Sequence, residues 1–282
     1  MAPRSARVAE HRLAESVLRT ISRPLDPRCA RFTEGCYGYE ERSRGPLARS
    51  EFATASLVMI FEIGAPLRVS NGARDVRHAG GFVAGLHDGP TLTEHGGHQA
   101  GVQLNLSALA ARELLGIPLA ELAHDVVSLA DALPRAHRQL PRRLGELATW
   151  EARLDAVESL LLRPPEPPRA GFTELAWAVA QIERSRGAVR MRALARELGW
   201  SERRLQRAFA HEIGLAPKRF ARLVRFEALT ARVRAGDHVR WAEDAQALGY
   251  YDEAHLSREV REFTGLAPSA AAALIAPSYA AA

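Results

Sequence analysis

The segments GWSERRLQRAFAHEIGLAP (199–217) and GYYDEAHLSREVREFTGLAP (249–268) decide the fold, because one is a near copy of the other. We align the two segments on their shared ending, GLAP, and allow one inserted residue in the second. Three further pairs of identical residues then match. The matched pairs are Leu205 with Leu256, Arg207 with Arg258, and Gly199 with Gly249. Such a register is rare by chance, so the sequence predicts one structural unit that occurs twice.

Each copy has the pattern of two helices joined by a tight turn. A short predicted helix, MRALAREL or WAEDAQAL, ends at a glycine, which adopts the left-handed conformation that closes a helix at low cost. Ser201 or Asp252 then supplies the N-cap of a second helix. In GLAP the glycine ends this second helix and the proline takes the first position of the next one. A helix, a short turn with glycine and a second helix predict a helix-turn-helix unit.

The second helix of each unit separates a buried from an exposed face. The predicted buried positions follow helical spacing; they are Leu205, Ala208 and Phe209 in the first unit and Leu256, Val260 and Phe263 in the second. Arginine and glutamine on the exposed face can bond guanine and adenine in the major groove, glutamate can accept from cytosine, and alanine can touch a thymine methyl. The exposed candidates are Arg203, Gln206 and Arg207, and then Glu253, Ala254, Ser257, Arg258 and Arg261.

A long helix is predicted between the two units, from Pro217 to about Arg234, where Gly236 stops it. Its roughly 18 residues span about 27 Å, which is near the 34 Å between successive turns of a major groove. Positive charge is concentrated in the same region: residues 184–240 contain 15 Arg and Lys against 5 Asp and Glu. This distribution favours a polyanionic partner.

Two helix-turn-helix units, a connecting helix and the ending G-Y-x-D-x-x-H-L-S-R-x-x-R-x-F-T-G-L-x-P-S resemble the AraC/XylS family of bacterial transcription regulators. The resemblance covers about residues 172–275. It implies a sequence-specific DNA-binding regulator whose base-reading positions are Arg203, Gln206, Arg207, Glu253, Ala254, Ser257 and Arg258. We expect DNA phosphate contacts from Ser201, Arg204, Lys218, Arg219, Arg222 and Arg261.

The resemblance also sets the expected partners. They are double-stranded operator DNA and, as further candidates, a small-molecule effector, RNA polymerase and a second copy of the chain.

After Pro268-Ser269 the family usually continues with an aromatic residue and an arginine, whereas this chain continues AAAALIA.

The expected fold class is α+β, with an N-terminal β-rich, cupin-like sensor domain with helices and a C-terminal all-α domain. The sensor or dimerisation domain is expected over residues 1–163, β-rich at 48–106 and helical at 107–163. Four prolines in five residues mark a linker at 164–170. The DNA-binding domain then occupies 171–282.

The composition excludes other classes of protein. Hydrophobic residues make up 47% and charged residues 25%, and no run approaches the roughly 18 to 20 apolar residues of a membrane span. The first 20 residues carry charges throughout and do not resemble a secretory signal, so we expect a soluble, cytoplasmic protein without a membrane partner. Cys29 and Cys36 are too few for a disulfide scaffold or a structural zinc site, which predicts two reduced thiols.

Cupin barrels bind metals with histidine and glutamate, so the histidines and glutamate between residues 78 and 98 suggest a metal site. The candidate ligands are His78, His87, Glu94, His95 and His98. Their spacing lacks H-x-H followed by glutamate, which favours surface or hydrogen-bonded histidines and predicts no metal and no cofactor. No nucleophile elbow, phosphate loop or zincin motif appears, so no catalytic residue is expected. Two alternatives stay open: a cupin-like metal-dependent enzyme fused to a DNA-binding domain, and a helical protein-interaction module with an incidental basic face.

Overall fold

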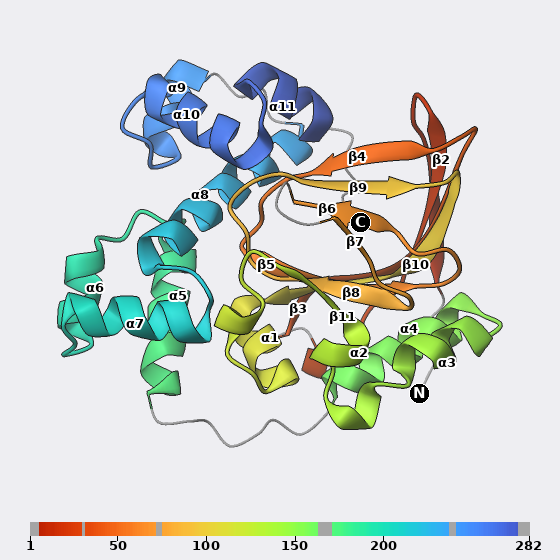
Figure 1. Cartoon of the computed structure of the whole chain (residues 1–282). Coiled ribbons are helices and arrows are strands. Elements are labelled where there is room, and N and C mark those ends of the chain that lie inside the picture. Colours follow the sequence, from red (N-terminus) through yellow and green to blue (C-terminus); the bar gives the residue numbers. More distant parts are fainter. Residues whose placement is uncertain (1–5, 30–31, 72–74, 163–170, 237–240, 276–282) are drawn as a thin grey trace.

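The computed structural model describes residues 6–29, 32–71, 75–162, 171–236 and 241–275. Its N-terminal half consists of two antiparallel sheets that face each other, and its C-terminal half is helical (Figure 1). The predicted α+β fold class is therefore confirmed. The expected linker at 164–170 lies outside the described residues.

The larger sheet has seven strands in the order β1-β2-β3-β10-β5-β8-β11, and the smaller has four in the order β4-β9-β6-β7. Both sheets are antiparallel throughout. The strands of the larger sheet are β1 Arg7–Arg12, β2 Ser16–Ser22, β3 Thr33–Ser43, β5 Ser56–Glu62, β8 Gly81–Ala84, β10 His98–Ser107 and β11 Val126–Ser128. Those of the smaller sheet are β4 Leu47–Glu51, β6 Arg68–Ser70, β7 Asp75–Arg77 and β9 Thr91–His95.

The apolar residues of strand β5 follow one another without a break because both faces of the strand are buried. Leu57, Met59 and Phe61 belong to the main core, whereas Val58 and Ile60 belong to a second apolar cluster. Since alternate side chains of a strand point to opposite faces, β5 is covered on both faces. Helices cover the outer face of the larger sheet and the smaller sheet covers the inner face (Figure 1).

The helical part of the N-terminal half begins directly after β10. Helix α1 (Ala108–Leu115) is capped by Ser107 and ends at Gly116 in the left-handed conformation. Helix α4 (Trp150–Leu161) packs on β3, where a Cβ on Gly38 would lie 2.6 Å from the Trp150 ring. A side chain at Gly38 would therefore displace α4 from the sheet. The remaining short helices are η1 Pro27–Cys29, η2 Leu119–Glu121, α2 Leu129–Ala132, η3 Arg135–His137 and α3 Leu140–Glu146.

The β-rich region is larger than the sequence analysis predicted. Strands begin at Arg7 instead of residue 48, and β11 interrupts the part that was expected to be helical. The missed strands carry many charges, because the β1 side chains are exposed or half-buried and β2 exposes Val17 and Arg19 between buried residues. A strand that faces solvent in this way lacks the apolar signal used to recognise strands.

The C-terminal half has the predicted order of helices. Helix α8 begins at Pro217 and ends at Arg234, as expected, and Ser201 and Asp252 are N-caps whose side chains accept backbone N–H bonds. Gly199 and Gly249 have φ angles of 65° and 81°, so each turn needs the left-handed conformation. The helices are α5 Phe172–Arg184, α6 Met191–Glu197, α7 Glu202–Glu212, α8 Pro217–Arg234, α9 Trp241–Ala247, α10 Glu253–Thr264 and α11 Pro268–Ile275.

Candidate DNA-binding site

Helices α7 and α10 are the second helices of the two units, and each is anchored on α8 by an aromatic pair. Phe209 of α7 lies 6.1 Å from Phe220, and Phe263 of α10 lies 5.2 Å from Phe226, measured between ring centroids. All four rings are buried. Because both pairs use the same connecting helix, α8 fixes the two helices relative to each other.

The outer faces of α7 and α10 are open to solvent. The predicted buried residues Leu205, Phe209, Leu256, Val260 and Phe263 are buried, and Ala208 is half-buried. The predicted base-reading residues are exposed except Ser257, which is half-buried; the exposed ones are Arg203, Gln206, Arg207, Glu253, Ala254 and Arg258. The fold therefore leaves this set accessible on two similar helices, and its contact with bases stays a prediction.

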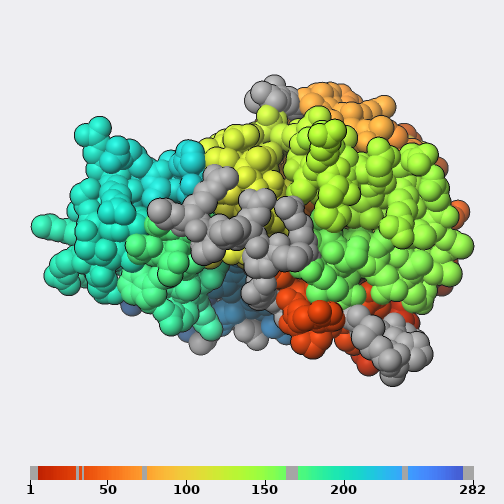
Figure 2. Space-filling view, turned by 90° about the horizontal axis from the view of Figure 1, so that it is seen from below, coloured from red at the N-terminus to blue at the C-terminus, as the bar shows by residue number. Residues whose placement is uncertain are grey.

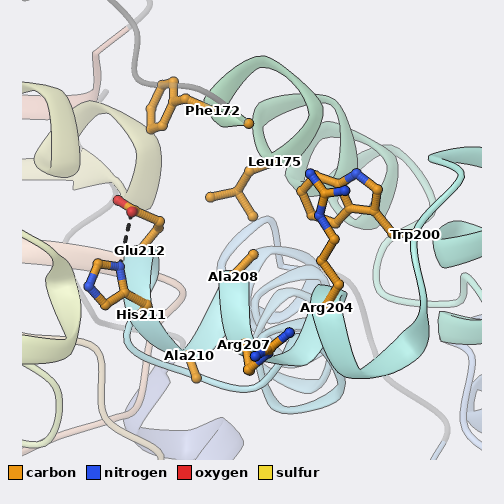
Figure 3. A pocket seen from close by; sticks show the side chains of 10 residues that line it. Phe172, Leu175, Trp200, Arg204, Arg207, Ala208, Ala210, His211 and Glu212 are labelled. Carbon is orange, nitrogen blue, oxygen red and sulfur yellow. Dashed lines mark hydrogen bonds and ion pairs between the residues drawn. The ribbon is translucent and has the colours of Figure 1, made fainter.

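A hollow of about 750 Å³ lies beside α7, between this helix and α5 (Figure 3). Phe172 and Leu175 of α5 line one side, and Arg207 lines the side of α7. The guanidinium of Arg204 stacks on the Trp200 indole, 4.3 Å from the ring centroid. Such a contact orients the arginine while its N–H groups stay free to bind an anion.

The predicted phosphate-contacting residues have different surroundings. Lys218 and Arg261 are exposed, and the Ser201 hydroxyl accepts the Arg204 N–H as the N-cap. Arg219 forms ion pairs with Asp88 and Glu262. These residues stay predictions as phosphate contacts.

Arg222 is engaged by two carboxylates of α10. It donates to Glu259 at 2.7 Å and also pairs with Glu262, while Arg225 donates to the same Glu259 at 3.1 Å. Glu259 is only 1% exposed, and the hydrogen bond from Arg222 lowers the pKa of Glu262. This cluster holds the second unit on α8, a role that the sequence analysis missed because Glu259 lies between residues of the apolar face.

The N-terminal half contacts both units at the far ends of their second helices. Arg112 of α1 donates to Glu212, the last residue of α7, at 2.5 Å. The teal segment of the C-terminal half lies directly against the N-terminal half in the space-filling view (Figure 2). At the end of α10, the Ala53 N–H donates to the Phe263 carbonyl at 3.3 Å. Glu227 of α8 accepts from the Ala55 N–H at 2.8 Å and from the Thr54 hydroxyl.

No sequence pattern could have indicated these contacts, because the partners lie 100 or more residues apart. Their consequence is geometric. The C-terminal ends of α7 and α10 face the N-terminal half, so their N-terminal ends point away from it. In a helix-turn-helix protein the N-terminal end of the second helix is the part that meets the bases.

The polar residues of the metal hypothesis do not form a cluster. His78 hydrogen-bonds the Val126 carbonyl and His87 the Gly85 carbonyl, while His98 lies 3.4 Å from Glu40. Within the described residues, no three His, Cys, Asp or Glu side chains are placed to hold a metal ion. Both cysteines are buried and neither is in a disulfide, and burial raises the pKa of Cys36 to about 12.

Comparison with known proteins identifies the helical half. Residues 194–273 match the family model described as a helix-turn-helix domain. Among solved structures, ToxT from Vibrio cholerae O395 is similar at 10% identity over 87% of this chain and 98% of ToxT, with a TM-score of 0.49. The AraC-like transcriptional activator CuxR is similar at 17% identity over 80% of this chain and 81% of CuxR, with a TM-score of 0.24. A comparison with curated protein sequences finds no match.

The family match begins within α6 and ends within α11, and it therefore includes most of the first unit, the whole second unit and the helix that joins them. Among the helices that the structure describes, none is long and apolar enough to cross a bilayer. The C-terminal part of the chain thus contains a helix-turn-helix domain.

Proposed function

We propose that this protein is a DNA-binding transcription regulator, as its resemblance to the AraC/XylS family implies. It reads two adjacent major-groove segments of one operator through α7 and α10, under the control of its N-terminal half. The observation that carries the proposal is the shared orientation of the two helices. Each has a free N-terminal end with exposed polar residues, and each has a C-terminal end that contacts the N-terminal half. The 18 residues of α8 span about 27 Å, close to one turn of DNA.

The base readers in this proposal are the residues expected from the sequence. Arg203, Gln206 and Arg207 would read the first segment, and Glu253, Ala254, Ser257 and Arg258 the second. Arg258 donates to the Ala254 carbonyl at 3.2 Å; it would have to exchange this bond for a base. The proposal includes no catalytic step and no metal.

Control by the N-terminal half is supported by its contacts with three different helices. Arg112 touches α7, Thr54 touches α8 and Ala53 touches α10. A small molecule or a second copy that shifts the segment 53–55 or α1 would therefore change how the two recognition helices are placed. We expect the domain boundary to lie at residues 164–170, between this controlling part and the DNA-binding part.

The test is a binding-site selection with the full-length protein, followed by affinity measurements on the selected duplex. Arg207→Ala should lose about 1–3 kcal/mol on this duplex and little on random DNA, because it removes a base contact. Arg142→Ala is the matched control, since it removes the same charge from an exposed site in α3 of the N-terminal half. Equal losses on selected and random DNA would contradict base reading by Arg207.

Control is tested on the same duplex with and without small-molecule extract from cells. An effector should change the dissociation constant of the unaltered protein. It should change that of Thr54→Val less, because this variant lacks the hydrogen bond of the Thr54 hydroxyl to Glu227 and keeps only that of the Ala55 N–H. An effector response of the same size in both proteins would contradict transmission through this contact.

A further inference from the structure

Tyr251 is an aromatic side chain that the fold leaves in solvent. It is 84% exposed, the most exposed of the large hydrophobic residues that the structure describes. Large aromatic rings are usually buried to a considerable extent. The ring and hydroxyl group of Tyr251 are therefore accessible to a binding partner.

Comparison of the two units shows that Tyr251 is the inserted residue of the second. In the first unit the buried Trp200 is followed directly by the N-cap Ser201, whereas in the second unit Tyr251 separates the buried Tyr250 from the N-cap Asp252. Trp200 and Tyr250 are both buried, and each lies beneath an arginine guanidinium: Arg204 of α7 at 4.3 Å and Arg225 of α8 at 4.8 Å. Tyr250 thus fills the structural position, and Tyr251 is not needed for it.

The main chain holds Tyr251 at the start of the second recognition helix. Its N–H donates to Nδ1 of His255 in the first turn of α10 at 3.2 Å, and the His255 ring packs edge-on against Tyr250. The residue that precedes the N-cap of a recognition helix lies at the rim of the groove, where the DNA backbone passes. Tyr251 therefore presents a hydroxyl group at the place where phosphate oxygens are expected.

The negative charge of the second unit favours a phosphate contact made by an uncharged donor. Residues 241–282 contain 2 Arg and 6 Asp or Glu, a net charge of −4. The arginines of α8 nearest to α10 do not supply the missing charge, because Arg222 and Arg225 are paired with Glu259. Neutral donors such as a phenol hydroxyl can bind phosphate without an added cation.

We propose that the Tyr251 hydroxyl donates a hydrogen bond to a DNA phosphate at the edge of the groove read by α10. The inference rests on the proposed function, since it needs α10 to lie in a major groove. It adds a residue that anchors the second unit without releasing a counterion.

The experiment uses full-length protein and the duplex obtained by selection. Tyr251→Phe removes only the hydroxyl, at an exposed site, and should weaken binding about 3- to 10-fold. The salt dependence should stay unchanged, because a neutral donor displaces no condensed cation. Lys218→Ala, which removes an exposed cation of α8, is the contrast, and it should lower the salt slope by about 1.

A second arm locates the bond. Replacing phosphates one at a time by neutral methylphosphonates should reveal one position that weakens the unaltered protein but has no additional effect on Tyr251→Phe. Unchanged affinity of Tyr251→Phe, or a loss only with Tyr251→Ala, would overturn the proposal, because the ring and not the hydroxyl would then matter. In that case base reading by Arg207 and Arg258 would still stand. If selection enriched no sequence, the proposed function would fall and this inference with it.

Discussion

Asp88, in the loop before β9, forms an ion pair with Arg219 in the first turn of α8. The carboxylate thus occupies an arginine that is expected to contact a DNA phosphate. Carboxylate and phosphate use the same guanidinium N–H groups, so the two contacts exclude each other at those groups. If Arg219 contacts a phosphate as predicted, the N-terminal half would compete with DNA for this residue.

Removing the charge of Asp88 should strengthen DNA binding. We expect Asp88→Asn to bind the selected duplex several-fold more tightly than the unaltered protein, with a steeper salt dependence because one more cation reaches the backbone. Both changes should vanish in the double variant Asp88→Asn/Arg219→Ala. Tighter binding that persists without Arg219 would show that Asp88 acts through a different group.

The ion pair between Arg112 and Glu212 should couple the two halves energetically. Arg112 is 4% exposed. Burial raises the pKa of Glu212, but the hydrogen bonds and charges of Arg112 and His211 lower it by more. The net shift of the pKa is therefore downward. Glu212→Gln leaves a buried cation with a weaker partner, and it should destabilise the full chain more than the double variant Arg112→Met/Glu212→Gln does. A double-mutant cycle on urea unfolding should give a coupling energy of about 1–3 kcal/mol. Additive effects of the two substitutions would show that the pair contributes nothing to the interface.

Substitutions of Arg222 and Lys218 should have different effects: one on the stability of the fold and the other on phosphate binding. Arg222→Ala takes one of two arginines from the buried Glu259 and should lower the free energy of unfolding by about 1–3 kcal/mol. Lys218 is exposed at the start of α8, so Lys218→Ala should leave stability unchanged and reduce only the salt slope of DNA binding. The contrary result is an Arg222→Ala variant with an unchanged free energy of unfolding and a salt slope reduced by about 1. That result would support a phosphate contact of Arg222 and contradict its structural role beside Glu259.

The sequence predicted the helical half closely because its signals are local. The ends of α8, the N-caps Ser201 and Asp252 and the left-handed Gly199 and Gly249 follow from residues within one or two turns of each feature. The repeat added a second copy of the turn glycine and of the N-cap, so that an error in one unit would have appeared as a disagreement with the other.

What the sequence could not predict depends on contacts between distant residues. Whether Arg222 faces a phosphate or a carboxylate is decided by Glu259, 37 residues away on another helix. The pairing of Arg219 with Asp88 depends on how the two halves dock. Strands β1 and β2 were missed for a related reason, since they become part of the sheet only when β2 pairs with the distant β3 and β1 pairs with β2.

Glu62 predicts how stability depends on pH. It is 5% exposed between the two sheets, where one carboxyl oxygen accepts the Leu67 N–H, and burial raises its pKa to about 7. A carboxyl group with a raised native pKa binds its proton more tightly in the folded state. Its contribution to stability is therefore complete below the unfolded pKa of about 4.3 and is lost as the pH rises through about 7.

Glu62→Gln keeps a neutral group of the same size at this site. The variant should be about as stable as the unaltered protein at pH 5, and more stable at pH 8 by an amount on the order of 1–3 kcal/mol. Urea unfolding of both proteins at the two pH values measures the difference, and Glu15→Gln, at an exposed position, should show none. A gain of equal size at pH 5 and pH 8 would mean that Glu62 is not protonated in this range, and that the substitution acts through packing alone.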